Sequence, residues 1–249
     1  EGHKVVPFCP RCETPLSSHE VALGYKDVTE PTITVKFKLK NKNQYLLAWT
    51  TTPWTLPSNL ALAINPKIDY AVVKQDNSEY ILASDLVKKY FENAKIIKKI
   101  KGKELLNLKY EPIFPYFKNL KNSFKIIAGK FVSTEEGTGI VHMAPAFGED
   151  DYEACKLNKI DFVQPIDETG HFTSEVKDFR GMFVKDADPK IIDYLEKKEI
   201  LFSKESYTHS YPFCWRCETP LIYYAMKSWF IKVSSFRDQL LKNNAKINW

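Results

Sequence analysis

The sequence lacks the signatures of several large protein classes. No apolar run reaches the roughly 18 residues of a membrane-spanning helix, and the chain shows no signal-peptide pattern. It contains neither a Walker A loop nor a GxGxxG fingerprint, so we expect no ATP binding by those devices. It also has no strong serine–histidine–aspartate or cysteine–histidine pattern for nucleophilic catalysis. These absences predict a cytoplasmic chain that does not enter a membrane and uses no covalent nucleophile.

The composition is that of a globular protein with one large domain or two small ones. Of the 249 residues, 44% are hydrophobic, and the 16 Phe, 13 Tyr and 5 Trp are enough to build a packed core. The net charge of +5 is mild, so it permits a nucleic-acid partner without requiring one. Lysines concentrate between Lys88 and Lys109, which indicates either a solvated face or a surface that faces phosphates. Because the chain begins with Glu1 and ends on Trp249, we expect a monomeric fragment of a longer protein.

Four of the five cysteines form two CxxC pairs with nearly identical flanks. The segments PFCPRCETPL (7–16) and PFCWRCETPL (212–221) match at nine of ten positions. Two thiolates on a tight turn can bind one metal, and Zn²⁺ prefers four ligands in a tetrahedron. A disulfide fits poorly in a cytosolic chain. We therefore predict a structural zinc site formed by Cys9, Cys12, Cys214 and Cys217, with reduced, metal-free thiols as the alternative. The fifth, Cys155, is expected to be a small buried apolar residue.

A shared metal would have a topological consequence. Cys12 and Cys214 are 202 residues apart, yet one ion would hold both. Residues 31–204 would then form an insertion, and the metal ion would hold its two ends close together. The flanking residues 1–30 and 205–249 would form a zinc-ribbon stem.

Hydrophobic periodicity predicts an α+β insertion centred on a curved sheet or barrel. Two hairpins are expected, at 33–39 with 44–49 and at 70–75 with 79–83, and further strands at 124–128, 139–142 and 200–203. Helices are expected from a Ser84 cap to about Asn93, over 189–198 and 236–243, and from EDDY at 149–152.

Two stretches carry an unusual density of polar groups. In AWTTTPWTLPSN (48–59), threonines stand where a buried strand ends, because Pro53 cannot continue a central ladder. In GTGIVHMAPAFGEDDY (137–152), a strand bears His142, and three acids open a helix, where the macrodipole favours anions. Each feature also has an ordinary explanation: threonine suits strands, acids cap helices, and a lone histidine is commonly a core residue. Three acids, however, exceed what a cap needs.

Together these two stretches resemble the editing domain, connective peptide 1, of the isoleucyl-tRNA synthetase family. The flanking segments CPRCETPL and THSYPFCWRCETPL resemble its zinc-binding stem, and the second of them resembles the sequence of the eukaryote-type branch. The resemblance therefore covers essentially the whole chain. Valyl and leucyl relatives typically carry arginine at the position of Thr52. The HIGH and KMSKS signatures of the parent synthetase are absent, so this fragment is expected to form no aminoacyl-adenylate and to bind no ATP.

The resemblance implies a β-barrel-like domain that hydrolyses valine from mischarged tRNA(Ile). It implies that Asp151 accepts the α-ammonium group of valine and that His142 forms a wall that excludes isoleucine. By the same resemblance the other site residues bind the terminal adenosine, the ester and the attacking water; they are Thr50, Thr51, Thr52, Thr55 and Asn59. Trp54 would stack a base or pack in the core. The implied partners are the valine-bearing 3′ end of tRNA(Ile) and the rest of the synthetase.

Three other readings compete with this one. A zinc-dependent RNA-binding module without catalysis would also use two CxxC turns and a lysine-rich face. A hydrolase for a different mischarged amino acid, such as threonine on tRNA(Val), is disfavoured by Thr52. A folded fragment that is nearly inactive without the synthetase body is the third.

Overall fold

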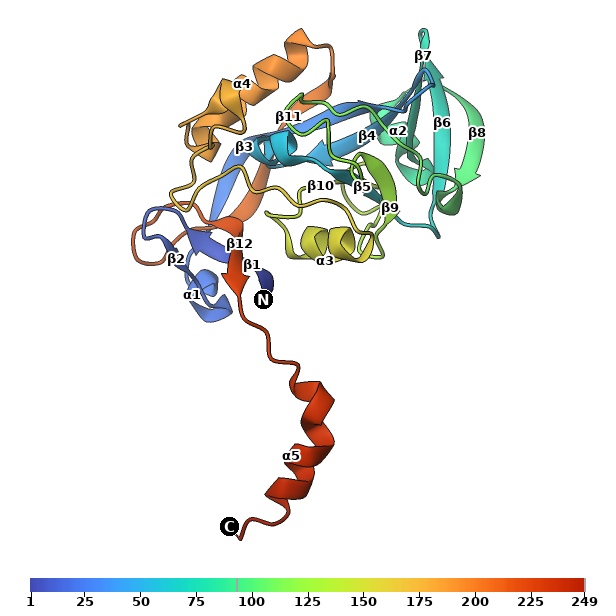
Figure 1. Cartoon of the computed structure of the whole chain (residues 1–249). Helices are drawn as coiled ribbons and strands as arrows, with labels where there is room; N and C mark the ends of the chain where they lie inside the picture. Colours follow the sequence, from blue (N-terminus) through green and yellow to red (C-terminus); the bar gives the residue numbers. More distant parts are fainter. Residues whose placement is uncertain (93, 249) are drawn as a thin grey trace.

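The stem pairs the two ends of the chain in one small sheet. The computed structural model describes residues 1–92 and 94–248. Strand β1 (Gly2–Cys9) pairs antiparallel with β12 (Ile222–Ser228) and, at its end, with β2 (Thr14–Pro15). Helix α1 (Ser18–Ala22) follows, held by a capping box between Ser17 and Glu20. Figure 1 shows these elements below the body, with the C-terminal helix α5 (Arg237–Asn244) extending away.

A long antiparallel ribbon connects the stem to the body. Strand β3 (Tyr25–Lys38) pairs with β11 (Leu201–Pro212) over most of its length. Its stem-side residues are largely exposed, whereas Thr32–Val35 are buried. The ribbon begins a six-stranded sheet of order β11-β3-β4-β7-β6-β8. The added strands are β4 (Gln44–Thr50), β7 (Ser78–Ala83), β6 (Asp69–Gln75) and β8 (Lys95–Lys101).

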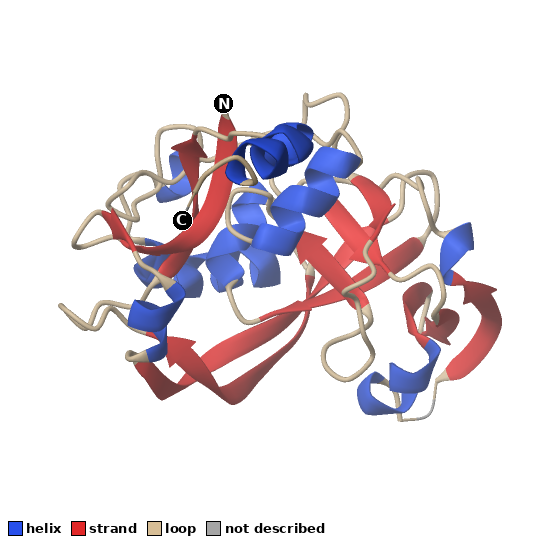
Figure 2. Ribbon diagram, turned by 90° about the horizontal axis from the view of Figure 1, so that it is seen from below, coloured by secondary structure: helices blue, strands red, loops and turns tan. Residues whose placement is uncertain are grey.

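A second, three-stranded sheet packs against this one. Strand β5 (Ala61–Ile64) lies between β10 (Ile140–Met143), antiparallel, and β9 (Lys125–Ala128), parallel. Every residue of β5 is buried, as expected for a central strand with both faces covered. Strand β10 also packs on β4, so the end of β4 lies beside β10. The strands β6 and β8 lie at the other end of the body from the stem (Figure 1). Figure 2 shows the strands in red and the helices in blue, seen from below.

Two helices position the loops around these sheets. Helix α4 (Val184–Lys197) places Val184, Ala187, Ile191, Ile192 and Leu195 in the core and packs on the 3₁₀ turn η1 (Pro53–Ser58). Helix α3 (Glu149–Leu157) follows β10. The remaining short elements are α2 (Val87–Tyr90) and the 3₁₀ turns η2 (Ser84–Leu86), η3 (Gly102–Glu104), η4 (Lys177–Phe179) and η5 (Val233–Phe236). None of the described helices is long and apolar enough to cross a membrane.

The predicted α+β class and both predicted hairpins are confirmed, and three element predictions need correction. A helix capped by Ser84 is wrong: a 3₁₀ turn leads into α2, which ends at Tyr90, and Asn93 lies outside the described residues. Strand β11 continues to Pro212, because its partner β3 supplies hydrogen bonds that local sequence does not reveal. Helix α4 begins at Val184 rather than Pro189, since its apolar face is anchored before the proline. Among the described residues, the hydrogen bonds form separate sheets rather than one closed barrel.

Candidate functional site

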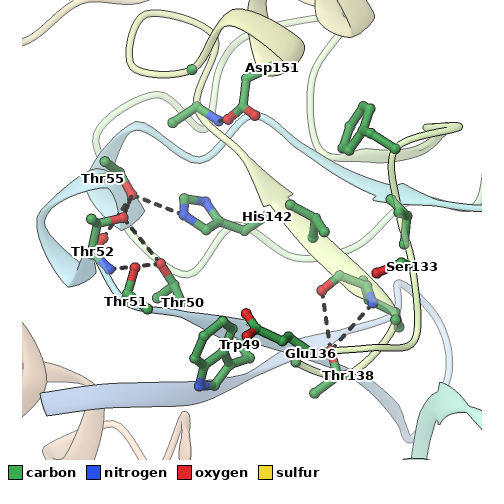
Figure 3. A pocket seen from close by; sticks show the side chains of 18 of the residues that line it. Trp49, Thr50, Thr51, Thr52, Thr55, Ser133, Glu136, Thr138, His142 and Asp151 are labelled. Atoms are coloured by element: carbon green, nitrogen blue, oxygen red, sulfur yellow. Dashed lines mark hydrogen bonds between the residues drawn. The ribbon is translucent and has the colours of Figure 1, made fainter. Parts of the chain in front are cut away.

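A cavity of about 380 Å³ opens where β4 ends beside β10 and the start of α3 (Figure 3). The threonine stretch and the loop that bears His142 and Asp151 both line it. These segments are about 90 residues apart in the chain, and the β4–β10 packing brings them together. Of the residues that the resemblance implies, six lie at this cavity: Thr50, Thr51, Thr52, Thr55, His142 and Asp151.

Three of the four cavity threonines, Thr50, Thr52 and Thr55, form one hydrogen-bonded rim. Thr50 ends β4, and its Oγ1 accepts the backbone N–H of Thr52 at 3.1 Å. The Thr52 hydroxyl lies 3.3 Å from that of Thr50 and 3.4 Å from that of Thr55. Thr55 donates its hydroxyl hydrogen to the Thr52 carbonyl at 2.8 Å. Strand β4 ends at Thr50, and Pro53, which has no N–H to continue a ladder, opens the 3₁₀ turn η1 that follows.

His142 projects from β10 against this rim and is held neutral. Its Nε2 lies 2.9 Å from the Thr55 hydroxyl oxygen. Because Thr55 gives its own hydrogen to Thr52, Nε2 donates in this contact, which assigns the Nε2–H tautomer. Nδ1 is then a bare acceptor, buried without a partner among the described residues. Burial lowers the pKa of His142 to about 4. At neutral pH the ring is therefore an uncharged wall and a weak base.

Asp151 stands across the cavity, in the first turn of α3. Its Oδ2 accepts the backbone N–H of Ala144 at 2.7 Å. Gly148 permits this approach, because a Cβ there would lie 2.8 Å from the Asp151 Cγ. Burial, with a smaller contribution from the charge of Asp150, raises the pKa of Asp151 to about 7. A carboxylate held this way gains from a cationic ligand group, because the cation restores its preference for the ionised form.

The raised pKa of Asp151 predicts a pH-dependent stability of the ligand-free chain. The folded carboxyl keeps its proton up to about pH 7, whereas the unfolded one loses it near its ordinary value of 3.8. Its stabilising contribution is therefore complete below about pH 4 and is lost as pH rises toward 7. Relative to Asp151→Asn, the free energy of unfolding should fall by up to about 1.4 kcal/mol per pH unit across this window. Urea titrations of the wild type and of Asp151→Asn at pH 5, 6 and 7 give the difference between their free energies of unfolding, and the contribution of His142, present in both proteins, cancels in it. If this difference does not change with pH, the raised pKa of Asp151 is contradicted.

Two of the implied site residues, Asn59 and Trp54, do not line the cavity. Asn59 is buried behind η1, where its amide donates to the Ala61 carbonyl at 2.9 Å and accepts the Tyr110 hydroxyl at 2.7 Å. Trp54 is 2% exposed and packs edge-on against Phe147, with ring centroids 5.2 Å apart. Of the two alternatives for Trp54, the structure therefore shows core packing.

The opposite wall contains residues that sequence reasoning missed. Trp49, Ser133 and Glu136 lie on the side away from Asp151 (Figure 3). Glu136 Oε1 accepts the Tyr207 hydroxyl at 3.0 Å, so the β11 ribbon supports this wall. The only sequence signal nearby was the glycine bend. Gly139 has a φ of +74°, and a Cβ there would lie 2.5 Å from the Ala83 Cβ.

The four stem cysteines form a separate cluster with metal-binding geometry. The sulfurs of Cys9, Cys12, Cys214 and Cys217 all lie within 4.8 Å of one another, and those of Cys9 and Cys217 are 3.4 Å apart. All four are free thiols. Zn–S bonds of 2.3 Å in a tetrahedron place the sulfurs about 3.8 Å apart, so the donor set fits such an ion. Cys155 lies apart, buried in the main core as predicted.

Comparisons with known proteins agree with this architecture. The family model for class I tRNA synthetases (I, L, M and V) matches residues 1–249. The isoleucine–tRNA ligase of Clostridium tetani is 53% identical and that of Picrophilus torridus 50% identical, each over 100% of this chain and 24% of the relative. The chain thus spans about a quarter of the length of these relatives.

The fold is also found in solved structures of editing domains. The editing domain of the cytosolic leucyl-tRNA synthetase of P. knowlesi has a TM-score of 0.57 at 14% identity, and covers 75% of this chain and 99% of that chain. The CP1 region of the leucyl enzyme GlLeuRS has a TM-score of 0.56 at 16% identity, over 72% of this chain and 100% of its own. At these identities the likeness concerns the fold alone. The chain belongs to the class I tRNA synthetase family of the isoleucine, leucine, methionine and valine enzymes, and it has the fold of the leucyl-tRNA synthetase CP1 editing domains.

Proposed function

We propose that this chain is the proofreading unit of an isoleucine–tRNA ligase, which hydrolyses valine from mischarged tRNA(Ile). The observation that carries the proposal is the shared cavity, with threonine hydroxyls on one side and the half-buried carboxyl group of Asp151 on the other. The aminoacylation pocket of isoleucyl-tRNA synthetase is the known example of weak discrimination. It prefers isoleucine over valine by only about 150-fold, because one methylene contributes little binding free energy. A second, smaller hydrolytic site supplies the missing accuracy.

The chemistry of the cavity suits hydrolysis of an ester that is already activated. Such a reaction needs a held water molecule, a held carbonyl group and exclusion of the wrong substrate, but no protein nucleophile. Hydroxyl groups both donate and accept, so Thr50, Thr51 and Thr52 can orient water and ribose without reacting. Thr55 completes this rim through its bond to His142. The held water molecule then attacks the carbonyl carbon of the ester, and the bond from this carbon to the ribose oxygen breaks. The ribose oxygen leaves as a hydroxyl group with a proton from the water.

Recognition of the amino acid is assigned to the two residues across the cavity from each other. Asp151 accepts the α-ammonium group through a charge-assisted hydrogen bond. His142 limits the space for the side chain, since it is anchored by Thr55 and buried on β10. Valine fits this space, whereas the extra methylene of isoleucine meets the imidazole. The role of His142 is therefore steric.

The division of the chain and its partners form part of the same proposal. Residues 31–204 would be the editing domain, and residues 1–30 and 205–249 the stem that joins it to the synthetase core. The stem would hold a structural zinc ion with Cys9, Cys12, Cys214 and Cys217, which fixes the two ends of the insertion. The partners would be the 3′ end of tRNA(Ile) and the rest of the synthetase, whose core forms the adenylate. The location would be the cytoplasm.

A direct test compares two aminoacyl esters. Incubation of the chain with valyl-tRNA(Ile) should release valine much faster than the spontaneous rate, while isoleucyl-tRNA(Ile) should remain intact. An RNA-binding module without catalysis would leave both esters intact or protect them. If neither ester reacts, a nonhydrolysable valyl-adenosine mimic is titrated and the NMR shifts of Thr52 and His142 are followed. Binding at the cavity would indicate an editing site that is nearly inactive in this fragment, and no binding would contradict the proposed function.

Metal removal should separate the stem from the cavity. With the zinc ion chelated, we expect the two CxxC turns to lose stability while the ester-hydrolysing cavity is retained, because the cysteine cluster packs in its own small core. Strands β1 and β12 pack in the main core and should be affected less. Hydrogen exchange of the stem amides and the rate of valine release, measured before and after chelation, report the two modules. A parallel loss of both would contradict the proposed independence of stem and cavity.

A further inference from the structure

The cavity wall opposite Asp151 is formed in part by a loop, residues 129–139, which connects β9 to β10 without a helix or strand of its own (Figure 3). We call it the wall loop. Its residues 133–136 are exposed or half-buried, and Ser133 and Glu136 among them line the cavity. Because such an exposed segment has few packing contacts, its place in the site depends on how the residues on either side of it are held.

The wall loop is anchored before and after this exposed segment. Before it, the side-chain amide of Asn65 donates to the Val132 carbonyl at 3.0 Å. After it, the Thr138 hydroxyl donates to the Leu47 carbonyl of β4 at 2.6 Å. Gly137 lies between the second anchor and the exposed segment. Its position therefore sets the direction in which the segment leaves the core.

Tyr90, the last residue of α2, holds Gly137 from outside the cavity. Its hydroxyl donates to the Gly137 carbonyl oxygen at 2.9 Å, and Tyr90 itself does not line the cavity. The Tyr90 ring packs in a small apolar cluster with Phe91 and lies 6.3 Å from the Phe202 ring centroid. Burial raises the pKa of Tyr90 above its ordinary value of 10, so the hydroxyl keeps its proton and remains a donor at neutral pH.

Gly137 is also the point at which the wall loop meets Trp49, another residue of the same wall. Gly137 has a φ of +69°, which favours glycine. A Cβ at this position would lie 3.3 Å from the Trp49 Cε3 atom, so the backbone lies close against the indole. A hydrogen bond at the Gly137 carbonyl therefore fixes the wall loop and the indole relative to each other.

We propose that Tyr90 is a positioning residue: from α2 its hydroxyl holds the Gly137 carbonyl, and this bond keeps the wall loop and Trp49 in place across the cavity from Asp151. This role rests on the proposed function, which assigns the amino group of the substrate to Asp151 and so leaves the opposite wall to the adenosine end. Tyr90 thus acts on how the end of the tRNA binds. The choice between valine and isoleucine is left to His142.

The test compares Tyr90→Phe, which removes the hydroxyl and keeps the ring, with Tyr80→Phe. Tyr80 of β7 is half-buried against the same apolar cluster, and its hydroxyl forms no hydrogen bond within the part of the chain that the structure describes, so it is the matched control. We expect Tyr90→Phe to raise KM for valyl-tRNA(Ile) about 5-fold, because the Gly137 carbonyl loses its partner, with kcat changed less than about 2-fold. The preference for valine over isoleucine should not change, and the control should behave as wild type. Urea titrations of both variants identify conditions in which each is fully folded, and the rates are measured there.

An NMR comparison of the ligand-free proteins tests the hydrogen bond itself. The Thr138 amide shares a peptide group with the Gly137 carbonyl, so its resonance should move in Tyr90→Phe, together with those of residues 133–136, and stay in place in Tyr80→Phe. A Thr138 amide that moves no more than in the control, an unchanged KM, or an altered preference for valine would overturn the proposal. If the wild type releases no valine, the proposed function fails, and the NMR comparison still decides whether Tyr90 holds the wall loop.

Discussion

Asp151→Ala is expected to reduce hydrolysis of valyl-tRNA(Ile) by about 100-fold or more while the fold is retained. The substitution removes the carboxyl group that faces the cavity, and a cationic amino group entering it then has no counter-ion. Truncation of one partner of a buried charge pair typically costs 2–5 kcal/mol, which corresponds to this range. Single-turnover rates of valine release from the wild type and the variant provide the measurement.

Two further variants separate charge from structure at this position. Asp151→Asn keeps an oxygen for the Ala144 N–H but has no charge, so it should be as inactive as the alanine variant and more stable. Asp150→Ala, at the exposed neighbouring position of the same helical turn, should keep nearly full activity. An unchanged rate in Asp151→Ala would remove this residue from the site.

The second large effect is expected on selectivity. His142→Ala should let the chain hydrolyse isoleucyl-tRNA(Ile), because removal of the imidazole opens space beside the threonine rim. One methylene accounts for about 10- to 200-fold in such a pocket, so the preference for valine should shrink by a factor of this size. The ratio of kcat/KM for the two esters, measured side by side, gives the result.

A bulk-retaining variant tests whether the role is steric. His142→Phe fills the same space but loses the hydrogen bond to Thr55, so it should still spare isoleucyl-tRNA(Ile), at a reduced rate on the valyl ester. If His142→Ala also spares the isoleucyl ester, the wall that excludes isoleucine lies elsewhere. The cavity then offers Trp49, Phe131 and Phe147 as the other large side chains to examine.

The sequence alone determined much of the local structure. The hairpins of β3–β4 and β6–β7 follow from alternating apolar residues, because that alternation is itself the pattern of a half-buried strand. Pro53 marked the end of β4, and the glycine bend at 137–139 marked the start of β10. The repeated CxxC segments indicated that two distant stretches share one site, and the structure brings their sulfurs together.

Only the tertiary structure decided which polar residues face the cavity and which support it. Asn59 lies on the same polar stretch as the threonines, yet it turns to Tyr110 in the core, because η1 rotates successive side chains to opposite sides. Glu136 gave no local signal, since its partner Tyr207 lies on β11, far away in the chain. Sequence pattern reports the period and polarity of one segment at a time. The convergence of Thr55, His142 and Asp151 on one cavity depends on how two sheets and a helix pack, which is a property of long-range contacts.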